Sequence, residues 1–337
     1  MQDRVINSQA MESAHVLSPT HLNAATSAVA VAQRILANVE RVLEGKREVV
    51  QLAVSALFAR GHLLLEDVPG VGKTTLARAL ASSVGLDFRR VQFTSDLMPA
   101  DVLGGAIFSQ ATGQFTFRKG PVFTNVLLAD EINRTTPKTQ SALLEAMGER
   151  RVSIDGETRV LDEPFFVLAT QNPEEFYGTY PLPESQLDRF LMRLRIGYPP
   201  QEVEREVLAR RRGGEPVEEL TAVVDRRDLL AAQESVGHVR TSDELLDYLH
   251  ALVLATRSTP LLSIGASTRA ALALEAAVRA YALVLGRTYA IPDDVKAVAV
   301  AVLAHRVRAA GLRDTGTGFG DGERVIRELL SSLPVPI

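Results

Sequence analysis

The sequence predicts an α/β protein in which a five-stranded parallel sheet lies between helices and is followed by a helical domain. Three observations lead to this prediction. Three leucines run into a glycine-rich loop and a helix-forming stretch, within Leu63–Leu76. Short, nearly continuous apolar segments then recur with helical patterns between most of them, as strands buried on both faces of a sheet require. After Tyr198-Pro199-Pro200 the pattern becomes helical and rich in alanine.

Two helices are predicted before the first strand. Residues 1–20 are polar and lack a clear period, so we interpret them as a mobile tail. Apolar residues recur at helical spacing in Ala28–Leu43 and again in Arg47–Arg60, and Gly61 is expected to end the second helix.

Five apolar segments are the predicted strands of the sheet, and their alternation with helices favours a parallel arrangement. They are Leu63–Leu65, Val91–Phe93, Val126–Leu128, Phe165–Leu168 and Leu191–Ile196. The predicted core domain therefore covers residues 21–200, and the helical domain covers residues 201–337.

Two segments interrupt the alternation of strands and helices. Residues 106–117, within Asp96–Phe123, predict two short strands around Ala111-Thr112-Gly113. Arg151–Val160 alternates around Asp155-Gly156, a strong hairpin turn. Each is predicted to be a β-hairpin, and an ordinary surface hairpin is the simplest interpretation of either one.

The helical domain is predicted to hold five helices, a loop and a last short helix. Thr241 and Glu244 resemble a capping box, and Pro292 suits the first turn of a helix. A glycine-rich loop is expected at Gly311–Gly322, before the last helix around Glu323–Ser332. The five helices are expected at Gln201–Arg212, Asp225–Ser235, Thr241–Thr256, Ser267–Leu285 and Asp293–Ala309.

Composition narrows the class of protein. With 337 residues, 46% apolar and 23% charged, the chain has a globular composition and room for about two domains. A formal net charge of −4 argues against binding nucleic acid by overall charge. The absence of cysteine excludes disulfides, thiolate metal sites and thiol nucleophiles. Without a long apolar run or a signal-peptide core, we expect a cytoplasmic protein.

The loop within Leu63–Leu76 has the order strand, loop, helix that cradles phosphates. Its backbone N–H groups face a phosphate at the positive end of a helix dipole. Lys73 is expected to reach the β- and γ-phosphates, and the Thr74 hydroxyl to ligate Mg²⁺. The pattern places glycine where this chain has Asp67, whose carboxylate must therefore point away from the phosphates or be neutralised. The expected nucleotide-binding residues are Asp67, Val68, Pro69, Gly70, Val71, Gly72, Lys73, Thr74 and Thr75.

Polar side chains follow two later predicted strands. Asp130 and Glu131 end Val126–Glu131, where Asp130 would join the Mg²⁺ shell and Glu131 would polarise the water that attacks the γ-phosphate. Acids that favour a helix N-terminus are the alternative explanation. Asn172 ends Phe165–Pro173 and could hold the attacking water or a phosphate oxygen, although Asn-Pro also starts turns.

Two arginines are candidates for stabilising the transition state of phosphoryl transfer. Arg189 precedes the fifth predicted strand, and Arg269 lies at a predicted helix start. An arginine supplied in trans accelerates such reactions by roughly 10³–10⁵-fold. For Arg269 alone, a salt bridge or a solvated position is the alternative.

Taken together, these stretches resemble an AAA+ ATPase, and more closely the MoxR family. The resemblance runs from about Ile35 to Arg306, and its most specific part is Asn125–Phe190. It rests on EDVPGVGKT at 66–74, LLADEINR at 127–134, KTQSALLEAM at 138–147, VLATQNP at 167–173, GTYPLPESQLDRF at 178–190 and GASTRA at 265–270.

The resemblance implies an αβα core with five strands, a helical lid, bound ATP and Mg²⁺, and a ring that is usually a hexamer. It also implies an insert within the second helix at Asp96–Phe123 and a hairpin before the first sensor at Arg151–Val160, both facing the pore in related rings. The implied roles are the first nucleotide motif for Lys73 and Thr74, the second for Asp130 and Glu131, the first sensor for Asn172, the arginine finger for Arg189, and the second sensor, in cis or in trans, for Arg269. Arg134 is a weaker trans candidate.

By the same resemblance, the protein is expected to be a chaperone or remodeller that assists maturation of client complexes or metal insertion into them. A separate partner with a von Willebrand factor A domain is implied. The alternatives are the motor subunit of a metal chelatase, a nucleic-acid motor and a non-hydrolysing scaffold. Nucleic acid is not expected as a partner, since Arg118-Lys119 is the one basic spot of the insert.

Overall fold

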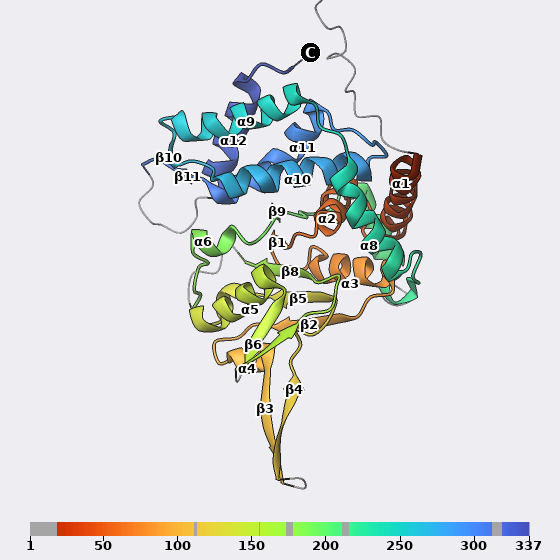
Figure 1. Ribbon diagram of the computed structural model, residues 1–337, viewed down its shortest axis with the longest axis vertical. Coiled ribbons are helices and arrows are strands. Elements are labelled where there is room, and N and C mark those ends of the chain that lie inside the picture. Colours follow the sequence, from red (N-terminus) through yellow and green to blue (C-terminus); the bar gives the residue numbers. More distant parts are fainter. Residues whose placement is uncertain are drawn as a thin grey trace, which may run out of the picture.

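A five-stranded sheet forms the centre of the protein (Figure 1). The computed structural model describes residues 19–110, 113–154, 156–172, 178–210, 216–311 and 319–336. The strand order is β2-β5-β8-β1-β9, and all neighbouring strands are parallel. The predicted fold class is thereby confirmed. The strands are β1 (Leu63–Glu66), β2 (Phe88–Gln92), β5 (Val126–Asp130), β8 (Phe166–Gln171) and β9 (Met192–Leu194).

The sheet is buried on both faces because its strands are apolar at successive positions. Leu63 and Leu65 pack in one hydrophobic cluster, whereas Leu64 packs in a second cluster on the opposite face. The first cluster includes residues of α1 (Pro19–Glu40), α2 (Arg47–Phe58) and α3 (Lys73–Val84). The second includes residues of α4 (Pro99–Leu103) and α5 (Pro137–Glu149). Helices therefore cover the sheet from both sides, as the sequence predicts.

The helices before the sheet have different ends from those predicted. Helix α1 begins at Pro19 and ends at Glu40, and α2 ends at Phe58. The residue with left-handed backbone after α2 is Arg60, at φ 54°, so the prediction that Gly61 ends the helix is wrong. Gly61 is needed for another reason, because a Cβ atom there would lie 2.4 Å from Leu191. Residues 1–18 of the predicted tail lie outside the described part.

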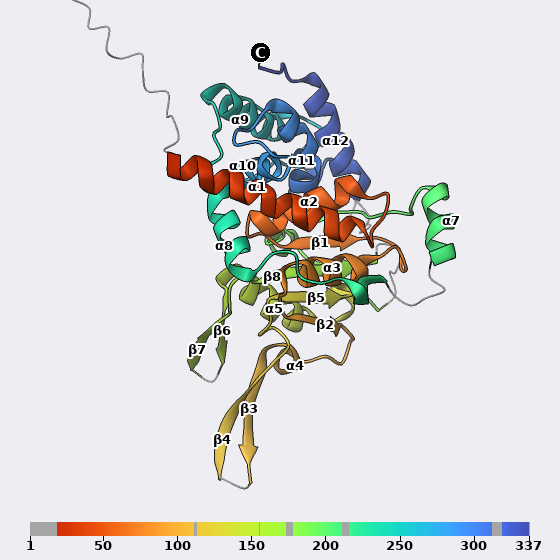
Figure 2. The same cartoon turned by 90° about the vertical axis from the view of Figure 1, so that its right-hand side faces the viewer.

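Both predicted hairpins are present. Strands β3 (Gly104–Ser109) and β4 (Gln114–Lys119) pair antiparallel and project far from the body, and β6 (Arg151–Ile154) and β7 (Glu157–Val160) form a shorter hairpin nearby (Figure 2). The Arg159 guanidinium lies 4.0 Å from the ring centre of Phe117, which links the two hairpins. Helix α4 precedes the longer hairpin, and no helix occurs between Lys119 and Val126, all of which is described. The turn residues Ala111, Thr112 and Asp155 lie outside the described part.

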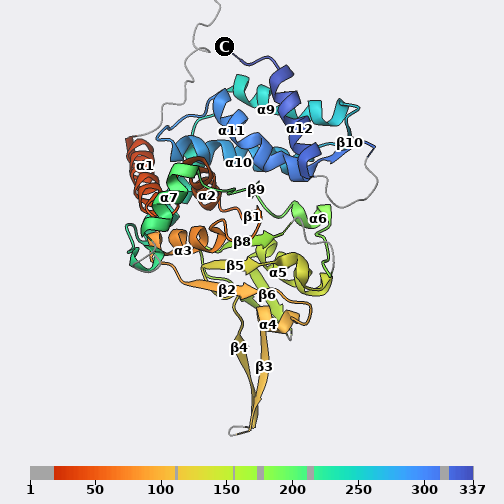
Figure 3. The same cartoon turned by 180° about the vertical axis from the view of Figure 1, so that it is seen from behind.

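The carboxy-terminal part is helical, as predicted. It packs against the core, because Gln233 Nε2 donates a hydrogen bond to Leu57 O at 2.7 Å and α10 lies across α2 (Figures 1 and 3). Its helices are α7 (Gln201–Arg210), α8 (Arg226–Ser235), α9 (Asp243–Ser258), α10 (Thr268–Val284), α11 (Pro292–Leu303) and α12 (Phe319–Ser332). Shorter elements of the whole chain are η1 (Ile132–Arg134), α6 (Glu184–Leu187), η3 (Pro216–Glu219), η4 (Val236–His238), β10 (Leu262–Ile264), η5 (Ala304–Arg306) and β11 (Arg308–Ala309).

Three details of the lid differ from the prediction. Ser242 caps α9 by accepting a hydrogen bond from Leu245 N, so the predicted capping box at Thr241 and Glu244 is wrong by one residue. The helix expected up to Ala309 ends at Leu303, because β11 pairs with β10. Helix α12 begins at Phe319, which removes the last residues from the predicted glycine-rich loop.

Glycine inside α12 serves close packing. A Cβ atom at Gly322 would lie 2.6 Å from Ala304 O, so glycine lets α12 approach η5. Residues 211–215 and 312–318, which include parts of a predicted helix and the predicted loop, lie outside the described part. Among the helices that the structure describes, none combines the length and apolarity needed to cross a membrane.

Candidate nucleotide site

The loop between β1 and α3 is shaped to receive an anion. Gly70 and Gly72 have φ angles of 87° and 100°, which glycine adopts without strain. The N–H groups of Gly70–Thr74 have no hydrogen-bond acceptor in the described part of the chain. They surround the amino terminus of α3, which begins at Lys73. Unpaired N–H groups at a helix N-terminus form a binding site for phosphate.

The Asp67 carboxylate accepts hydrogen bonds from backbone amides at both of its oxygen atoms. Its Oδ2 atom accepts hydrogen bonds from Ile196 N at 2.8 Å and Gly197 N at 2.6 Å. Its Oδ1 atom accepts one from Val68 N at 2.9 Å. Asp67 is not among the described residues with positive φ, so glycine is not required at this position. The carboxylate therefore joins the loop to the chain that follows β9.

Lys73 lies among the acids that the sequence singled out. Its Nζ atom donates a hydrogen bond to Asp67 O at 2.7 Å. Burial lowers the pKa of Lys73, and the negative charges of Asp130, Asp67 and Glu131 act in the opposite direction. The structure thus places the predicted lysine close enough to both predicted acids for their charges to act on it.

Asp130 is held at the carboxyl end of β5 by two side chains from neighbouring strands. Thr170 Oγ1 donates to Asp130 Oδ1 at 2.6 Å, and Arg90 Nε donates to Asp130 Oδ2 at 3.1 Å. Thr170 also accepts a hydrogen bond from Glu131 N at 2.9 Å and is fully buried. A single hydroxyl therefore fixes the positions of both acids.

Glu131 adopts a left-handed backbone, with φ 58°. Such strain in a non-glycine residue concentrates at functional sites. Its Oε2 atom accepts a hydrogen bond from Gln92 Nε2 at 2.6 Å and lies 3.1 Å from Arg134 Nε. Arg134, the weaker trans candidate, thus pairs with an acid of its own chain in this structure.

Sequence reasoning missed Arg90, Gln92 and Thr170. Alternate residues of a strand point to the same side, so Arg90 and Gln92 on β2 were detectable as a pair. The predicted strand at Val91–Phe93 starts three residues after the observed start at Phe88, which concealed this pair. Thr170 gave no signal of its own within an apolar strand.

Asn172 lies at the same edge of the sheet as the acids. It follows Gln171, the last residue of β8, and is buried. Strands β5 and β8 are adjacent and parallel, with Ala129 opposite Ala169. Asn172 is therefore placed next to the carboxyl end of β5, where the sequence predicted it.

The donor set fits Mg²⁺. This ion prefers oxygen ligands and usually takes one or two protein groups together with phosphate oxygens and water. The Thr74 hydroxyl has no hydrogen-bond partner in the described part of the chain, and Asp130 offers carboxylate oxygens near Lys73. No cluster of three or more His, Cys, Asp or Glu that could hold a metal occurs among the described residues. A site shared with phosphates suits this arrangement better than an all-protein cage.

Arg189 and Arg269 do not join this group. Strand β9 starts at Met192, which is opposite Leu63 at the start of β1, whereas the phosphate loop follows the end of β1. Arg189 therefore lies at the amino edge of the sheet, where the parallel strands begin. The carboxyl edge, where the strands end, is about 10 Å or more away, because a strand rises about 3.3 Å per residue. Its Nη1 atom donates to Leu144 O of α5 at 2.6 Å.

Arg269 contacts the residue that precedes Arg189. Its Nη1 atom is 3.5 Å from Asp188 Oδ2, one residue before Arg189. The side chain is 74% exposed, so this pair is weak. The structure thus separates the predicted site into a carboxyl-edge group and an amino-edge pair of arginines.

Comparison with known proteins identifies the family. The family described as "ATPase family associated with various cellular activities (AAA)" matches residues 62–192, and the AAA lid domain matches residues 254–329. The chain is 43% identical to Chaperone MoxR1 of Mycobacterium tuberculosis over 303 residues, which is 87% of this chain and 80% of that protein. The chain belongs to the MoxR family of AAA+ ATPases.

Other comparisons agree with membership of the MoxR family. The chain is 48% identical over 301 residues to a Bacillus subtilis protein named YeaC, whose name assigns no function, covering 89% of this chain and 93% of that protein. A crystal structure of a protein provisionally named an ATPase, from Cytophaga hutchinsonii, superposes with a TM-score of 0.84 at 36% identity, covering 94% and 98% of the two chains. The MoxR and AAA+ resemblance read from the sequence is confirmed.

Proposed function

We propose that this MoxR-family protein hydrolyses ATP with Mg²⁺ and uses the energy to remodel client proteins. We further propose that it works as a ring-shaped homo-oligomer, namely a hexamer. The observation that carries the proposal is the separation of Arg189 from Lys73 and Glu131 across the sheet. A lone chain has the groups that bind ATP and activate water, but its arginines face elsewhere. In a ring, the amino edge of one subunit can complete the carboxyl edge of the next.

Each residue has a role that its position supports. The amides of Gly70–Thr74 bind the phosphates, Lys73 contacts the β- and γ-phosphates, and Glu131 takes the proton of the attacking water. Asn172 orients that water or a γ-phosphate oxygen. Mg²⁺, held by Thr74 and Asp130, would neutralise charge on the phosphate oxygens.

Arg189 and Arg269 are proposed to act in trans, on the γ-phosphate bound by the neighbouring subunit. Arg189 lies at the amino edge of its own sheet and Arg269 contacts the preceding residue, Asp188, which supports the same direction of action for the two. For Arg269, this position favours trans over cis, an alternative that the sequence left open. Guanidinium groups stabilise negative charge on the transferred phosphoryl group.

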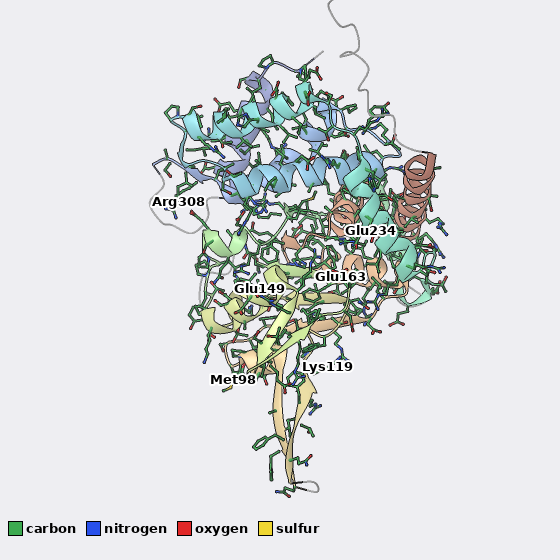
Figure 4. The ribbon with its side chains drawn as sticks, viewed as in Figure 1. Met98, Lys119, Glu149, Glu163, Glu234 and Arg308 are labelled. Carbon is green, nitrogen blue, oxygen red and sulfur yellow. The ribbon has the colours of Figure 1, made fainter. Side chains whose placement is uncertain are left out.

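The client contacts are proposed to lie on the β3–β4 hairpin. Phe108 and Phe115 face each other across it, with ring centres 5.2 Å apart, and both are more than half exposed. Met98 is also exposed and lies near the base of the hairpin (Figure 4). Exposed aromatic side chains on a projecting element are typical of protein–protein contacts. The name of the mycobacterial relative, a chaperone, supports clients that are proteins.

We further propose that the clients are complexes undergoing maturation or metal insertion in the cytoplasm. A separate partner that contains a von Willebrand factor A domain is proposed to deliver them, on family resemblance. The central experiment measures ATP turnover and ATP binding for the wild type and for Glu131→Gln. Turnover should fall by about 10²–10⁴-fold, the contribution of a general base, while ATP stays bound. Glu149→Gln, an exposed glutamate at the end of α5, is the matched control (Figure 4).

The same variant tests which proteins are clients. Glu131→Gln, loaded with ATP and recovered from the native cell, should retain proteins that the wild type releases. Recovery of a porphyrin-binding subunit would favour a chelatase motor. Stimulation of ATP turnover by DNA that declines with salt would favour a nucleic-acid motor. An unchanged turnover rate would remove Glu131 from the mechanism.

A further inference from the structure

The segment that carries Arg189 is held by the lid of the same subunit. Helix α6, which Figure 1 shows beneath the lid, and the residues that follow it, up to Leu191, contact η5 of the lid. Three lid arginines reach this segment. Arg269 and Arg306 contact Asp188, and Arg308 contacts Glu184 at 2.5 Å. Arg308 lies at the edge of the lid above α6 (Figure 4).

Arg306 makes the densest set of these contacts. Its Nε atom donates to Asp188 Oδ1 at 2.7 Å, and its Nη2 atom donates to Phe190 O at 2.7 Å and Asp188 O at 3.2 Å. Its Nη1 atom donates to Leu191 O at 3.0 Å and to Val302 O. All acceptors except Val302 belong to the segment around Arg189. The side chain is 4% exposed.

The surroundings of Arg306 make this contact rigid. Burial lowers the pKa of Arg306, and the hydrogen bond and charge of Asp188 counteract this effect. A guanidinium does not lose its proton in proteins, so the buried charge needs all of these acceptors. The preceding residue, His305, adds a hydrogen bond from Nε2 to Phe190 O at 3.0 Å. The lid cannot shift relative to Asp188–Leu191 without exposing or unpairing a buried charge.

Asp188 connects this buried contact to the two exposed arginines. One carboxylate oxygen accepts from Arg306, and the other lies 3.5 Å from Arg269. Arg189, the next residue, lies along α5 beside Gly148, where a Cβ atom would come within 2.4 Å of Arg189 Nη1. Arg269 is therefore paired with the carboxylate that Arg306 fixes, and Arg189 follows that same residue directly in the chain.

We propose that Arg306 is a positioning residue, through which the lid of each subunit sets the location of Arg189 and Arg269 for the neighbouring subunit. The inference rests on the proposed function, in which those two arginines act in trans. It also predicts in which direction the lid of one subunit influences ATP hydrolysis in the ring. A change of lid position in one subunit alters hydrolysis in the site of the next subunit, not in its own site.

Mixed assemblies test this direction. Arg306→Lys keeps the charge and one donor for Asp188 but loses the planar set of bonds to the carbonyls. Alone, it should lower ATP turnover by about 10-fold or more, with ATP binding unchanged within about 2-fold. Arg308→Ala, which removes an exposed lid arginine on the same segment, is the matched control and should change turnover by less than about 2-fold.

The mixtures give an asymmetric result if the proposal holds. Arg306→Lys mixed with Glu131→Gln should regain turnover, because the second subunit supplies intact arginines to the intact acid of the first. Arg306→Lys mixed with Arg189→Ala should stay low, because neither subunit supplies well-placed arginines. The reference is the mixture of Glu131→Gln with Arg189→Ala, and failure of that reference would contradict the proposed function instead.

Other outcomes overturn the role of Arg306. Recovery only with Arg189→Ala would place its effect in its own nucleotide site. Failure of both mixtures, with the reference active, would show a purely structural role, and full turnover of Arg306→Lys alone would show no role. If Arg306→Lys does not fold, Asp188→Asn replaces it, because this variant keeps the side-chain shape and leaves the carbonyl contacts of Arg306 in place. The same asymmetry is then expected.

Discussion

Asp67 Oδ2 accepts a hydrogen bond from Gly197 N at 2.6 Å, and this contact joins the phosphate loop to the chain that enters the lid. The phosphate-loop pattern has glycine at the position of Asp67, but here the aspartate carboxylate satisfies three backbone amides. Asp67→Gly would restore the pattern and leave those amides without an acceptor. Unsatisfied buried groups cost about 1–3 kcal/mol each.

We therefore expect Asp67→Gly to lower the free energy of unfolding by about 2 kcal/mol or more and to weaken ATP binding. Urea unfolding and titration with a fluorescent ATP analogue measure the two effects. Asp162→Gly, an aspartate in the loop before β8, controls for the added chain flexibility of glycine. Tighter ATP binding by Asp67→Gly would mean that the aspartate only replaces a missing glycine.

Thr170 holds both acids of the site through one hydroxyl. Thr170→Val keeps the shape but removes the donor to Asp130 and the acceptor for Glu131 N. We expect ATP turnover to fall by about 10–100-fold, because the two acids would no longer be held in place and small misplacements of catalytic groups cost about this much rate. Steady-state phosphate release measures it. Thr158→Val, at an exposed position of β7, should leave turnover unchanged, and an equal loss in both variants would contradict the role of Thr170.

His62 makes the fold sensitive to acid. It is fully buried, with Nδ1 accepting from Val167 N at 3.1 Å and Nε2 lying 3.2 Å from Met147 O. Burial, with a smaller effect from the Arg150 charge, lowers the pKa of His62 to about 4. The unfolded chain then binds a proton more readily than the folded chain between pH 6.5 and 4. Acid in this range therefore favours unfolding.

The expected loss of unfolding free energy follows from the ordinary pKa of histidine and the lowered pKa of His62 in the folded chain. His62 accounts for about 2 kcal/mol of the loss of unfolding free energy between pH 7 and pH 5. His62→Gln, which can accept and donate at similar positions but does not titrate, should show a correspondingly smaller loss. Urea midpoints across this pH range measure it, with the exposed His250→Gln as control. If the urea midpoint of His62→Gln falls with pH as steeply as that of the wild type, His62 is not the acid-sensitive group.

The hairpin aromatics should matter for clients and not for the fold. Phe108 and Phe115 are 51% and 72% exposed, so replacing both with serine removes little packing. We expect unchanged unfolding and ATP turnover within about 2-fold, because solvent-exposed positions contribute little to stability. Retention of clients by the ATP-loaded Glu131→Gln protein should be lost. Leu272→Ser, at an exposed position of the lid, is the control. If both proteins lose their clients equally, the loss does not depend on the hairpin aromatics.

The sheet could be predicted from the sequence wherever a strand is buried on both faces. The predicted Leu63–Leu65 and Val126–Leu128 start at the residues where β1 and β5 begin. Strand β2 was misplaced because it lies at the sheet edge, where Arg89 and Arg90 interrupt the apolar pattern. The short β10 and β11 gave no detectable period, since they pair only through tertiary contact.

The candidate site could be predicted only where a local pattern carries its chemistry. Lys73, Asp130 and Glu131 stand in recognisable sequence, and the structure brings them together. The contacts of Arg90, Gln92 and Thr170 arise between strands that are distant in sequence. Likewise, only the register of β9 on β1 shows that Arg189 lies at the opposite edge of the sheet.

The central claim is that one ATP site is built from two subunits. The most direct measurement is ATP turnover in a mixture of Glu131→Gln with Arg189→Ala, each of which we expect to be inactive alone. If Arg189 acts in trans, mixed rings contain sites with an intact Glu131 from one subunit and an intact Arg189 from its neighbour, and turnover returns. If turnover stays at the level of the separate variants while mixed rings form, Arg189 does not complete a neighbouring site, and the account is contradicted.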